Sequence, residues 1–318
     1  MEKLLTIAIP TFNRAEYLDK LLEWLAGAIK GFESDCEILI SDNCSSDHTP
    51  EVVKKWQNII KNIEINYNRN NHNIGLMPNF AYCLQAPKSK YVWVLGDDDV
   101  IKDGTLEYVI KNLKNHPDLA LLGLDYSIRS VLDNTMVHDR IFKSETEEVI
   151  ADSKSVIEHY LITDHSGLAF ISSIVYKTEA AKKALQKWPE SIHNMEGQTY
   201  WTAFCALYGS IKISTEVYIE YASNMLFLSK PKAWFKMHYG EIIEVYAKLL
   251  DIEYSRKLFS QLILKHFKEK NNWKVVLGAL RRWPLLTLNI IVPYFNFVVL
   301  SYLYSQLFWF GNFYKIKS

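Results

Sequence analysis

Three consecutive aspartates, Asp97, Asp98 and Asp99, are the strongest chemical signal in the sequence. Adjacent carboxylates repel one another, and removing them from water is costly unless a cation lies between them. Mg²⁺ or Mn²⁺ binds one or two protein carboxylates and completes its coordination shell with phosphate oxygens. Alternate residues of an extended segment point the same way, so this interpretation has Asp97 and Asp99 sharing a face. The alternative is an acidic turn or helix start, but the apolar run 91–95 just before the triplet favours a metal site.

A second candidate is Asp42, which lies in a segment of small hydrogen-bonding residues, Ser41–Asp47. A carboxylate at this point could accept a hydrogen bond from the imino group of a base or from a ribose hydroxyl. The alternative is a turn in which the aspartate bonds the backbone just after it, as Asp-Asn pairs commonly do. Both interpretations remain open for Asp42.

The elements that position these residues are predicted from hydrophobic periodicity. Residues 4–10 (LLTIAIP), 36–41 and 63–67 are short runs typical of strands. Asn13 with Glu16 predicts the start of a first helix, and Thr49 with Pro50 predicts the start of a second, whose buried stripe is residues 52, 53, 56, 59 and 60. Further along the chain we predict helices at 78–85, 105–114 and 197–208, and strands at 91–95, 119–126 and 168–176.

Strands that alternate with helices at this spacing predict a parallel sheet covered on both faces. Ligands of such sheets bind where the strands end. Polar residues do follow four of the predicted strands, at 11–14, 41–47, 73–75 and 96–99. We therefore expect one rim of the sheet to collect all four segments.

Four segments resemble, in order and spacing, the nucleotide-binding half of the family-2 glycosyltransferases, which have the GT-A fold. They are LLTIAIPTFNR (4–14), ILISDNCSSDHT (38–49), NHNIGLMPNF (71–80) and YVWVLGDDDV (91–100). The chain looks most similar to the abequosyltransferase-like branch of bacterial surface-polysaccharide synthesis. The resemblance implies an α/β fold with a Rossmann-like sheet over residues 1–225, followed by a C-terminal helical region at 226–318.

The resemblance also implies roles for individual residues. The triplet corresponds to the family's DxD motif, with Asp97 and Asp99 at a Mn²⁺ or Mg²⁺ ion and with Asp97 and Asp98 also at the donor. The residues implied to contact the nucleotide-sugar donor (UDP-, CDP-, GDP- or dTDP-linked) are Pro10, Thr11, Asn13, Asp42, Asn73 and Gly75. Arg14 either supports the phosphates or pairs with a surface acid.

The catalytic base is less clear, because many relatives carry a Glu-Asp pair at the start of the helix predicted here at 197–208, and this chain does not. Glu196 is the first candidate, since a carboxylate at a helix N-terminus beside a sugar site can act as general base. Its alternative role is to balance the helix dipole. Asp164 with His165 is the second candidate, although an exposed loop histidine is the simpler interpretation.

The C-terminal segment 284–314 has no charged residue and is flanked by basic ones. It is long enough to cross a bilayer, but Pro293 and three asparagines argue against a clean spanning helix. Its aromatic residues favour a pair of helices lying in the headgroup layer, where a polyprenyl-linked glycan acceptor would be met. A buried hairpin or a subunit interface is the alternative.

The composition narrows the remaining function classes. Hydrophobic residues make up 49% of the chain and 36 basic residues balance 36 acidic ones, which argues against a nucleic-acid partner. Four scattered cysteines predict reduced thiols, and we expect a cytoplasmic protein at the inner face of the cytoplasmic membrane. A nucleotidyltransferase is the nearest rival, although residues 10–14 lack the glycines of a phosphate loop. A catalytically silent glycan-binding or scaffold protein is the other alternative.

Overall fold

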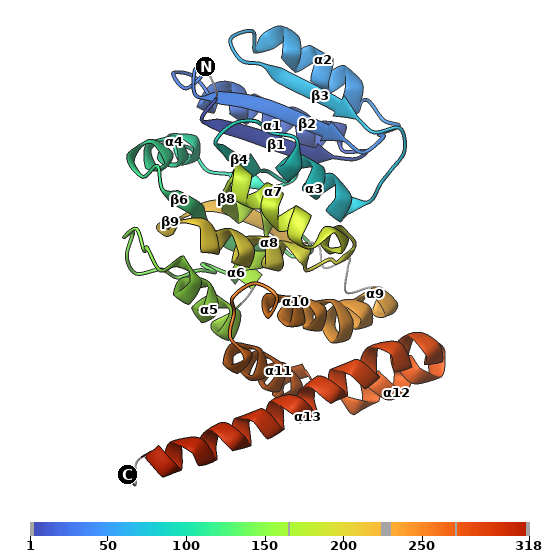
Figure 1. Ribbon diagram of the computed structural model, residues 1–318. Helices are drawn as coiled ribbons and strands as arrows, with labels where there is room; N and C mark the ends of the chain where they lie inside the picture. The colour runs from blue at the N-terminus through green and yellow to red at the C-terminus, as the bar shows by residue number, and fades with distance from the viewer. Residues whose placement is uncertain (1–2, 165, 224–229, 271, 316–318) are drawn as a thin grey trace.

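One nine-stranded sheet organises the first two thirds of the chain, and a group of helices lies beside it (Figure 1). The computed structural model describes residues 3–164, 166–223, 230–270 and 272–315. The strand order is β3-β2-β1-β4-β8-β6-β9-β5, with β7 paired to β6. The boundary predicted between residues 225 and 226 lies outside the described residues.

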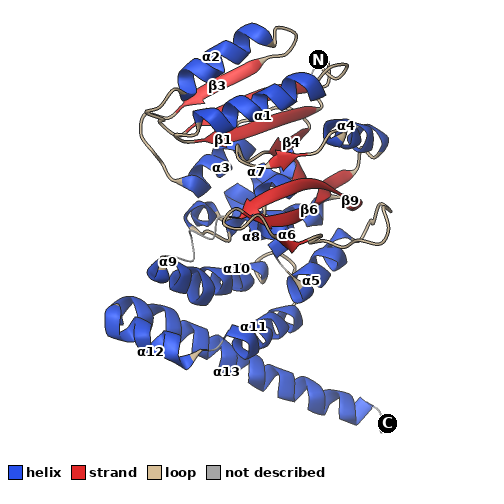
Figure 2. Cartoon of the chain, turned by 180° about the vertical axis from the view of Figure 1, so that it is seen from behind, coloured by secondary structure: helices blue, strands red, loops and turns tan. Residues whose placement is uncertain are grey.

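The first four strands are parallel, as the alternating pattern predicts. They are β1 (Leu5–Thr11), β2 (Cys36–Asp42), β3 (Ile65–Arg69) and β4 (Tyr91–Val94). The helices between them are α1 (Ala15–Ala28), α2 (Thr49–Ile59) and α3 (Leu76–Gln85). Because crossovers are right-handed and the chain turns back after β3, α1 and α2 cover one face and α3 the other (Figures 1 and 2). Ile59, predicted in the buried stripe of α2, is 55% exposed.

The second half of the sheet is mixed, so the predicted parallel arrangement is confirmed for β1–β4 but does not extend to every strand. Its strands are β5 (Val100–Ile101), β6 (Leu119–Ser130), β7 (Met136–His138), β8 (Ile174–Lys177) and β9 (Ser210–Ser223). β8 lies between β4 and β6 and runs antiparallel to both, whereas β6 and β9 run parallel. The start of β8 therefore lies at the edge of the sheet where β4 and β6 end.

The predicted strand at 168–176 is wrong over its first six residues. Residues before β8 form the short helix α6 (Ser166–Ala169) and a 3₁₀ turn, η1 (Ile171–Ser173). The Ser173 hydroxyl donates to the carbonyls of Gly167 and Phe170, which favours turns over an extended strand. This places the η1 turn on the rim of the sheet.

The remaining helices of the sheet region cover its second half. They are α4 (Thr105–Asn115), α5 (Ser153–Thr163), α7 (Thr178–Lys187), η2 (Pro189–His193), α8 (Gly197–Cys205) and η3 (Ala206–Tyr208). α7 and α8 pack on each other over the central strands. α8 begins on the side of the sheet where β1–β3 end (Figure 1).

The C-terminal region is helical, as predicted. Its helices are α9 (Pro231–Lys236), the π-turn η5 (Met237–Glu241), α10 (Ile242–Leu249), α11 (Arg256–Lys270), α12 (Trp273–Arg282) and α13 (Pro284–Lys315). The pair of helices predicted at 284–314 is wrong, because α13 is one helix of 32 residues with Pro293 inside it. Pro293 and Asn289 are both exposed, so water can satisfy the Asn289 carbonyl that loses its helical partner.

Candidate functional site

The aspartate triplet is joined directly to the end of β1. Asp97 is 4% exposed, and its two carboxylate oxygens accept from Thr11 Oγ1 at 2.7 Å and from Arg14 Nη1 at 2.8 Å. The same Arg14 nitrogen lies 2.8 Å from Asp98 Oδ2. Pro10 precedes these residues inside β1, opposite Ser41 of β2, and is buried. Arg14 thus partly neutralises two of the three acids.

Asp99 is held by the segment that precedes β8. Ser172 donates its hydroxyl proton to Asp99 Oδ2 and accepts a hydrogen bond from the Gly96 amide at 2.9 Å. Asp99 forms no ion pair with any residue that the structure describes. Burial, reinforced by the charges of Asp98 and Asp97, raises the pKa of Asp99 to about 8. This is the behaviour of a carboxylate that lacks a nearby cation.

This arrangement fits a divalent ion whose ligands come partly from the protein and partly from a substrate. Across residues 3–164, 166–223, 230–270 and 272–315, no group of three or more His, Cys, Asp or Glu side chains is placed to hold a metal ion alone. Asp97 has both oxygens engaged, whereas Asp99 is the acid that most needs a positive charge. A Mg²⁺ or Mn²⁺ ion at this point would therefore need phosphate oxygens as further ligands.

Gly96 allows Asp99 to approach the end of β4. A Cβ atom at residue 96 would lie 2.5 Å from Asp99 Oδ2, so the Gly96→Ala variant must displace that carboxylate. If Asp99 binds the metal ion that the sequence predicts, this variant should weaken binding of the metal with a nucleotide by roughly 10- to 100-fold, as misplacing a ligand shell typically does. Titration calorimetry with Mn²⁺ and a nucleotide diphosphate would measure the effect.

Gly27→Ala is the matched control, because nothing lies within 4 Å of a Cβ at this position of α1. The control should bind nucleotide normally and gain up to about 1 kcal/mol of stability, since alanine is the better helix former. If both variants bind the nucleotide with equal affinity, the observed position of Asp99 is not required for nucleotide binding.

Asp42 is fully buried and held from three directions. Its Oδ1 accepts from the Ser45 amide at 2.8 Å, which is the turn considered as the alternative role of this residue. Its Oδ2 accepts from the Tyr67 hydroxyl at 2.7 Å and lies 3.4 Å from Arg69 Nε. The carboxylate is therefore rigid and paired with a cation.

Asn13 does not cap α1 through its side chain as the sequence predicts. It adopts a positive φ of 53°, and its Oδ1 accepts from the Ser46 amide at 2.7 Å, which ties the loop after β1 to the loop after β2. Asp47 replaces it, because its carboxylate accepts from the amides of Ala15 and Thr49 at the starts of both helices. This role of Asp47 was not predicted, although an acid three residues before Pro50 is a usable signal.

Asn73 and Gly75 lie on the same rim, where Asn43 organises their loop. Asn43 Nδ2 donates to Asn73 Oδ1 at 2.9 Å and to the Gly75 carbonyl at 3.1 Å, and Asn43 Oδ1 accepts from the Ile74 amide. Gly75 has a φ of 99°, a left-handed conformation that favours glycine. Asn43 was not among the residues predicted to form the site.

An aromatic group beside the triplet also escaped the sequence analysis. Phe170 lies between Tyr126 of β6 and Tyr221 of β9, with ring centroids 4.4 Å and 5.0 Å away. Burial raises the pKa of Tyr221, and the nearby charges of Asp99 and Asp98 raise it further. Aromatic faces next to carboxylates are a usual surface for binding a sugar ring, which has apolar faces and hydroxyl edges.

Glu196 lies at the start of α8, next to the C-terminal helices. Its Oε2 is buried and has no hydrogen-bond partner within the described chain. Burial, together with the charge of Glu241 in η5, raises the pKa of Glu196 to about 7. The neighbouring Asn194 donates to the Glu241 carbonyl and to Glu244, so this end of α8 is fixed to α10. The structure does not bring Glu196 into contact with the triplet.

Asp164 ends α5 and is exposed, and its carboxylate accepts from both the amide and the hydroxyl of Ser166. The Ser166 carbonyl in turn accepts from the Tyr126 hydroxyl at 3.2 Å, so Asp164 is linked to the aromatic group. Its predicted partner His165 lies outside the described residues.

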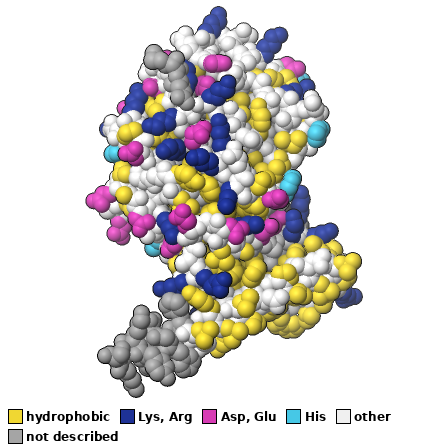
Figure 3. Space-filling view, viewed as in Figure 1, with side chains coloured by type: hydrophobic (Ala, Val, Ile, Leu, Met, Phe, Trp, Pro, Cys, Tyr) yellow, Lys and Arg dark blue, Asp and Glu magenta, His cyan; other side chains and the backbone are white. Residues whose placement is uncertain are grey.

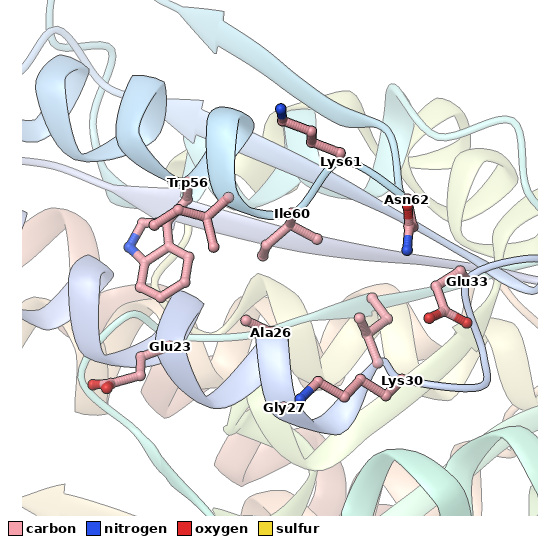
Figure 4. A pocket seen from close by; sticks show the side chains of 11 residues that line it. Glu23, Ala26, Gly27, Lys30, Glu33, Trp56, Ile60, Lys61 and Asn62 are labelled. Carbon is pink, nitrogen blue, oxygen red and sulfur yellow. The ribbon is translucent and has the colours of Figure 1, made fainter.

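A cavity of about 440 Å³ lies away from this rim, between the C-terminal parts of α1 and α2 (Figure 4). Trp56 and Ile60 face Ala26 and Gly27 across it. Helices α1 and α2 start at the rim and end at the opposite edge of the sheet, so this cavity is not part of the site.

Comparison with known proteins gives a family and a fold. The model of "Glycosyl transferase family 2" matches residues 6–171. The Abequosyltransferase RfbV of Salmonella typhimurium is 30% identical over 179 residues, which are 55% of this chain and 53% of the relative. The GalNAc(5)-diNAcBac-PP-undecaprenol beta-1,3-glucosyltransferase of Campylobacter jejuni is 32% identical over 111 residues, 34% of this chain and 33% of the relative. The chain thus spans about half or less of the length of these curated relatives.

Two solved structures share the fold at low sequence identity. Staphylococcus aureus TarS 1–349 in complex with UDP-GlcNAc has a TM-score of 0.65 and 17% identity, over 93% of this chain and 81% of that one. The mannosyltransferase PcManGT of Pyrobaculum calidifontis, in complex with GDP-Man and Mn²⁺, has a TM-score of 0.54 and 14% identity, over 95% and 84%.

Proposed function

Because the chain belongs to glycosyl transferase family 2, we propose that it transfers a sugar from a nucleotide-sugar donor to a hydroxyl group of a bacterial surface glycan. The observation that carries the proposal is the aspartate triplet, which Thr11 and Arg14 join to β1 and Ser172 joins to the segment before β8. Three acids at the carboxyl edge of a nucleotide-binding sheet are suited to a metal-bound diphosphate.

The donor would lie along the rim, from Asp42 to the triplet. Asp42 would face the base or ribose, Thr11 and Asn13 the nucleotide, and Asn73 and Gly75 the ribose or diphosphate. Arg14, Asp97 and Asp98 would lie at the phosphates and the sugar. The two similar structures are complexes with UDP-GlcNAc and with GDP-Man, which supports a nucleoside diphosphate sugar as the class of donor.

Asp99, with Asp97 beside it, would hold Mg²⁺ or Mn²⁺ together with the diphosphate. The raised pKa of Asp99 supports this role, because a cation would allow the carboxylate to ionise. When bound, the ion would neutralise the charge of the departing diphosphate. Asp97 would be held beside the ion by the Thr11 hydroxyl and the Arg14 guanidinium, which donate to its two oxygens.

Transfer also needs a base for the proton of the acceptor hydroxyl. The acceptor oxygen bonds to the anomeric carbon, the bond to the diphosphate breaks, and the hydroxyl proton passes to a carboxylate. Glu196 is our first candidate for this base because its pKa of about 7 suits proton transfer near neutral pH. Asp164 is the second candidate because it is connected to the aromatic group beside the triplet.

Binding of donors separates this function from its rivals. We would measure thermal stability with UDP-, GDP-, CDP- and dTDP-sugars, with and without Mn²⁺, and then donor hydrolysis with the stabilising sugar. A transferase should be stabilised by one donor together with the metal and should release the free sugar. A nucleotidyltransferase would instead release pyrophosphate from a nucleoside triphosphate, and a silent binding protein would release neither.

The acceptor is proposed to be lipid-linked and to be met at the inner face of the cytoplasmic membrane. Residues 284–307 of α13 are long enough to cross a bilayer. Their most apolar 18-residue window has a mean hydropathy of 1.6, yet only 22% of that window is buried. Apolar side chains gather on the coloured part of the α12–α13 arm in Figure 3. The undecaprenol in the name of the Campylobacter relative supports such an acceptor.

The packing of α13 favours a helix that lies on the membrane rather than one that crosses it. Thr287, Ile291, Tyr294, Val298 and Ser301 form a buried stripe, and α13 packs along α11. A second stripe at the same spacing is exposed, and it consists of Leu285, Leu288, Val292, Phe295, Val299 and Tyr302. A crossing helix would have to leave α11, whereas a helix lying in the interface keeps the buried stripe packed.

Charged residues in the exposed stripe should release the protein from vesicles. For Val292→Glu with Val299→Glu we expect vesicle binding to fall by roughly 10-fold or more per valine, because burying a valine contributes about 1.5 kcal/mol or more. Flotation with lipid vesicles measures this. The matched control is Val131→Glu with Leu132→Glu, two exposed apolar residues near the β6–β7 turn, and it should float like the wild type. Equal flotation of both double variants would contradict membrane contact by α13.

A further inference from the structure

A cavity of about 480 Å³ lies between α9 and α12, next to the apolar arm. Its walls combine two cations with large aromatic groups. The residues around it are Pro231, Trp234, Phe235, Lys274, Arg282 and Trp283, with Val275, Gly278 and Ala279 between the cations. A cavity of this composition suits a ligand that is anionic at one end and apolar at the other.

The two cations have no acidic partner in the described chain. Lys274 and Arg282 take part in none of its ion pairs, whereas nearby Lys236 pairs with Glu241 at 2.7 Å. They lie eight residues apart on α12, with Gly278 midway, so all three share one face of the helix. Nothing lies within 4 Å of a Cβ at Gly278, so the helix surface midway between the two residues is open. Neither charge is neutralised by an acid of the described chain, and both residues line the same cavity.

The cavity adjoins the surface that we propose to contact lipid. An exposed apolar stripe lies on α12 beside the face that lines the cavity. It consists of Trp273, Leu277 and Leu280, each adjacent in sequence to a residue of that face or one turn from it. Trp283 and Trp234 at the cavity are residues that prefer the headgroup level of a bilayer. An anion held by Lys274 and Arg282 would thus lie at the boundary between water and hydrocarbon.

The charge of the whole C-terminal region points to an anionic surface. The chain has no net charge, yet residues 226–318 contain 14 lysines and arginines against five acids. Such an asymmetry between the two parts of a chain is typical of a protein that binds an anionic membrane.

We propose that the cavity between α9 and α12 binds the phosphate of an anionic glycerophospholipid, with Lys274 and Arg282 as its donors. The acyl chains would lie along Leu277 and Leu280, and the tryptophans would pack beside the glycerol. This inference rests on the membrane contact of the proposed function. It adds a defined headgroup site to what would otherwise be apolar adhesion, and it fixes how the sheet region is oriented on the membrane.

Vesicle binding by the full chain tests the site. Vesicles of phosphatidylcholine alone are compared with vesicles that contain phosphatidylglycerol, for the wild type and for Lys274→Gln with Arg282→Gln. Two surface cations lost from an anionic interface should weaken binding to the phosphatidylglycerol vesicles roughly 30-fold. The matched control is Lys268→Gln with Arg281→Gln, which removes the same charge from exposed residues outside the cavity. The control should lose clearly less, and equal losses would overturn the site in favour of diffuse charge attraction.

A soluble lipid tests the same site without a bilayer. Monomeric dihexanoyl-phosphatidylglycerol should raise the melting temperature of the wild type and not that of the Lys274→Gln, Arg282→Gln variant. Dihexanoyl-phosphatidylcholine and inorganic phosphate, at the same concentration, should have no effect on either. Equal stabilisation by inorganic phosphate would overturn the assignment to a lipid.

Donor binding separates failure of this site from failure of the proposed function. The Lys274→Gln, Arg282→Gln variant should bind the nucleotide-sugar and hydrolyse it as the wild type does, because its substitutions lie in α12. Intact donor hydrolysis with no preference for phosphatidylglycerol in the wild type would overturn the lipid site alone. Loss of donor binding in the wild type would instead contradict the transferase assignment.

Discussion

The Asp99→Asn variant is expected to lose metal-dependent nucleotide binding and nearly all sugar transfer. Asparagine keeps the oxygen that accepts from Ser172 but carries no charge for a cation. If the metal lowers the barrier by about 4 kcal/mol through neutralising the diphosphate, kcat/KM should fall roughly 1,000-fold. Calorimetry with Mn²⁺ and the donor, followed by a transfer assay, measures both effects.

Asp103→Asn is the matched control, since Asp103 is an exposed acid four residues downstream. It removes the same charge and should change neither binding nor transfer. An Asp99→Asn variant that still binds Mn²⁺ with nucleotide as the wild type does would remove Asp99 from the proposed metal site.

The pH dependence of stability gives an independent check on Asp99. Its pKa in the folded protein is about 8, above the ordinary value of 3.8, so the folded state holds this proton more tightly than the unfolded chain. The resulting stability is fully present below about pH 4 and is lost as pH rises through about 8. Asp99→Asn should therefore stabilise the metal-free protein increasingly as pH rises, with the largest gain above about pH 8, and Mn²⁺ with nucleotide should bind more tightly as pH rises toward 8.

The second large effect is expected for Glu196→Gln. Removing a general base typically lowers the rate by 10²- to 10⁴-fold, so we expect kcat to fall roughly 1,000-fold while the affinity for the donor stays unchanged. The wild-type rate should rise with pH around 7, where Glu196 loses its proton, and the variant should lack that rise. Initial rates from pH 5.5 to 8.5 measure both.

Glu190→Gln is the control for Glu196, because Glu190 is an exposed acid in the turn just before α8.

A purely structural role for Glu196 would give a different result. The folded pKa of about 7 exceeds the ordinary 4.5, so stability from the protonated form is lost as pH rises through about 7. Glu196→Gln would then stabilise the protein above pH 7 and leave kcat unchanged.

Asp164→Asn distinguishes the two candidate bases. Asparagine keeps an oxygen for the amide and hydroxyl of Ser166, so the start of α6 should persist. A large loss of kcat in Asp164→Asn, together with a normal Glu196→Gln variant, would move the base from α8 to the rim beside Tyr126. Normal rates in both variants would contradict both assignments.

Most of the rim could be predicted because its residues follow buried strands. Each of β1, β2 and β4 is an apolar run, and parallel strands end at the same edge, so Thr11, Asp42 and Asp97 were expected to be neighbours. Two of these contacts are direct, since Thr11 donates to Asp97 and the last residues of β1 and β2 pair in register.

The residues that the sequence analysis missed are those whose partners lie far away along the chain. Ser172 is 73 residues from Asp99, and nothing in the run 168–176 marks it as different from a strand. Asn43 reaches across to the loop before α3, and Asp47 binds the first amide of α1 as well as its own helix. In each case the local sequence shows a polar residue but not what it binds.

The amino-acid sequence by itself determined the strand ends, the order of the first helices, the acidic triplet and the apolar C-terminal segment, because these depend on residue type and spacing over about ten positions. Only the tertiary structure decided that β8 runs antiparallel, that Ser172 meets Asp99, and that one face of α13 is packed while the other is exposed. The physical reason is that strand direction and long-range hydrogen bonds follow from which segments become neighbours, and local periodicity carries no information about that choice.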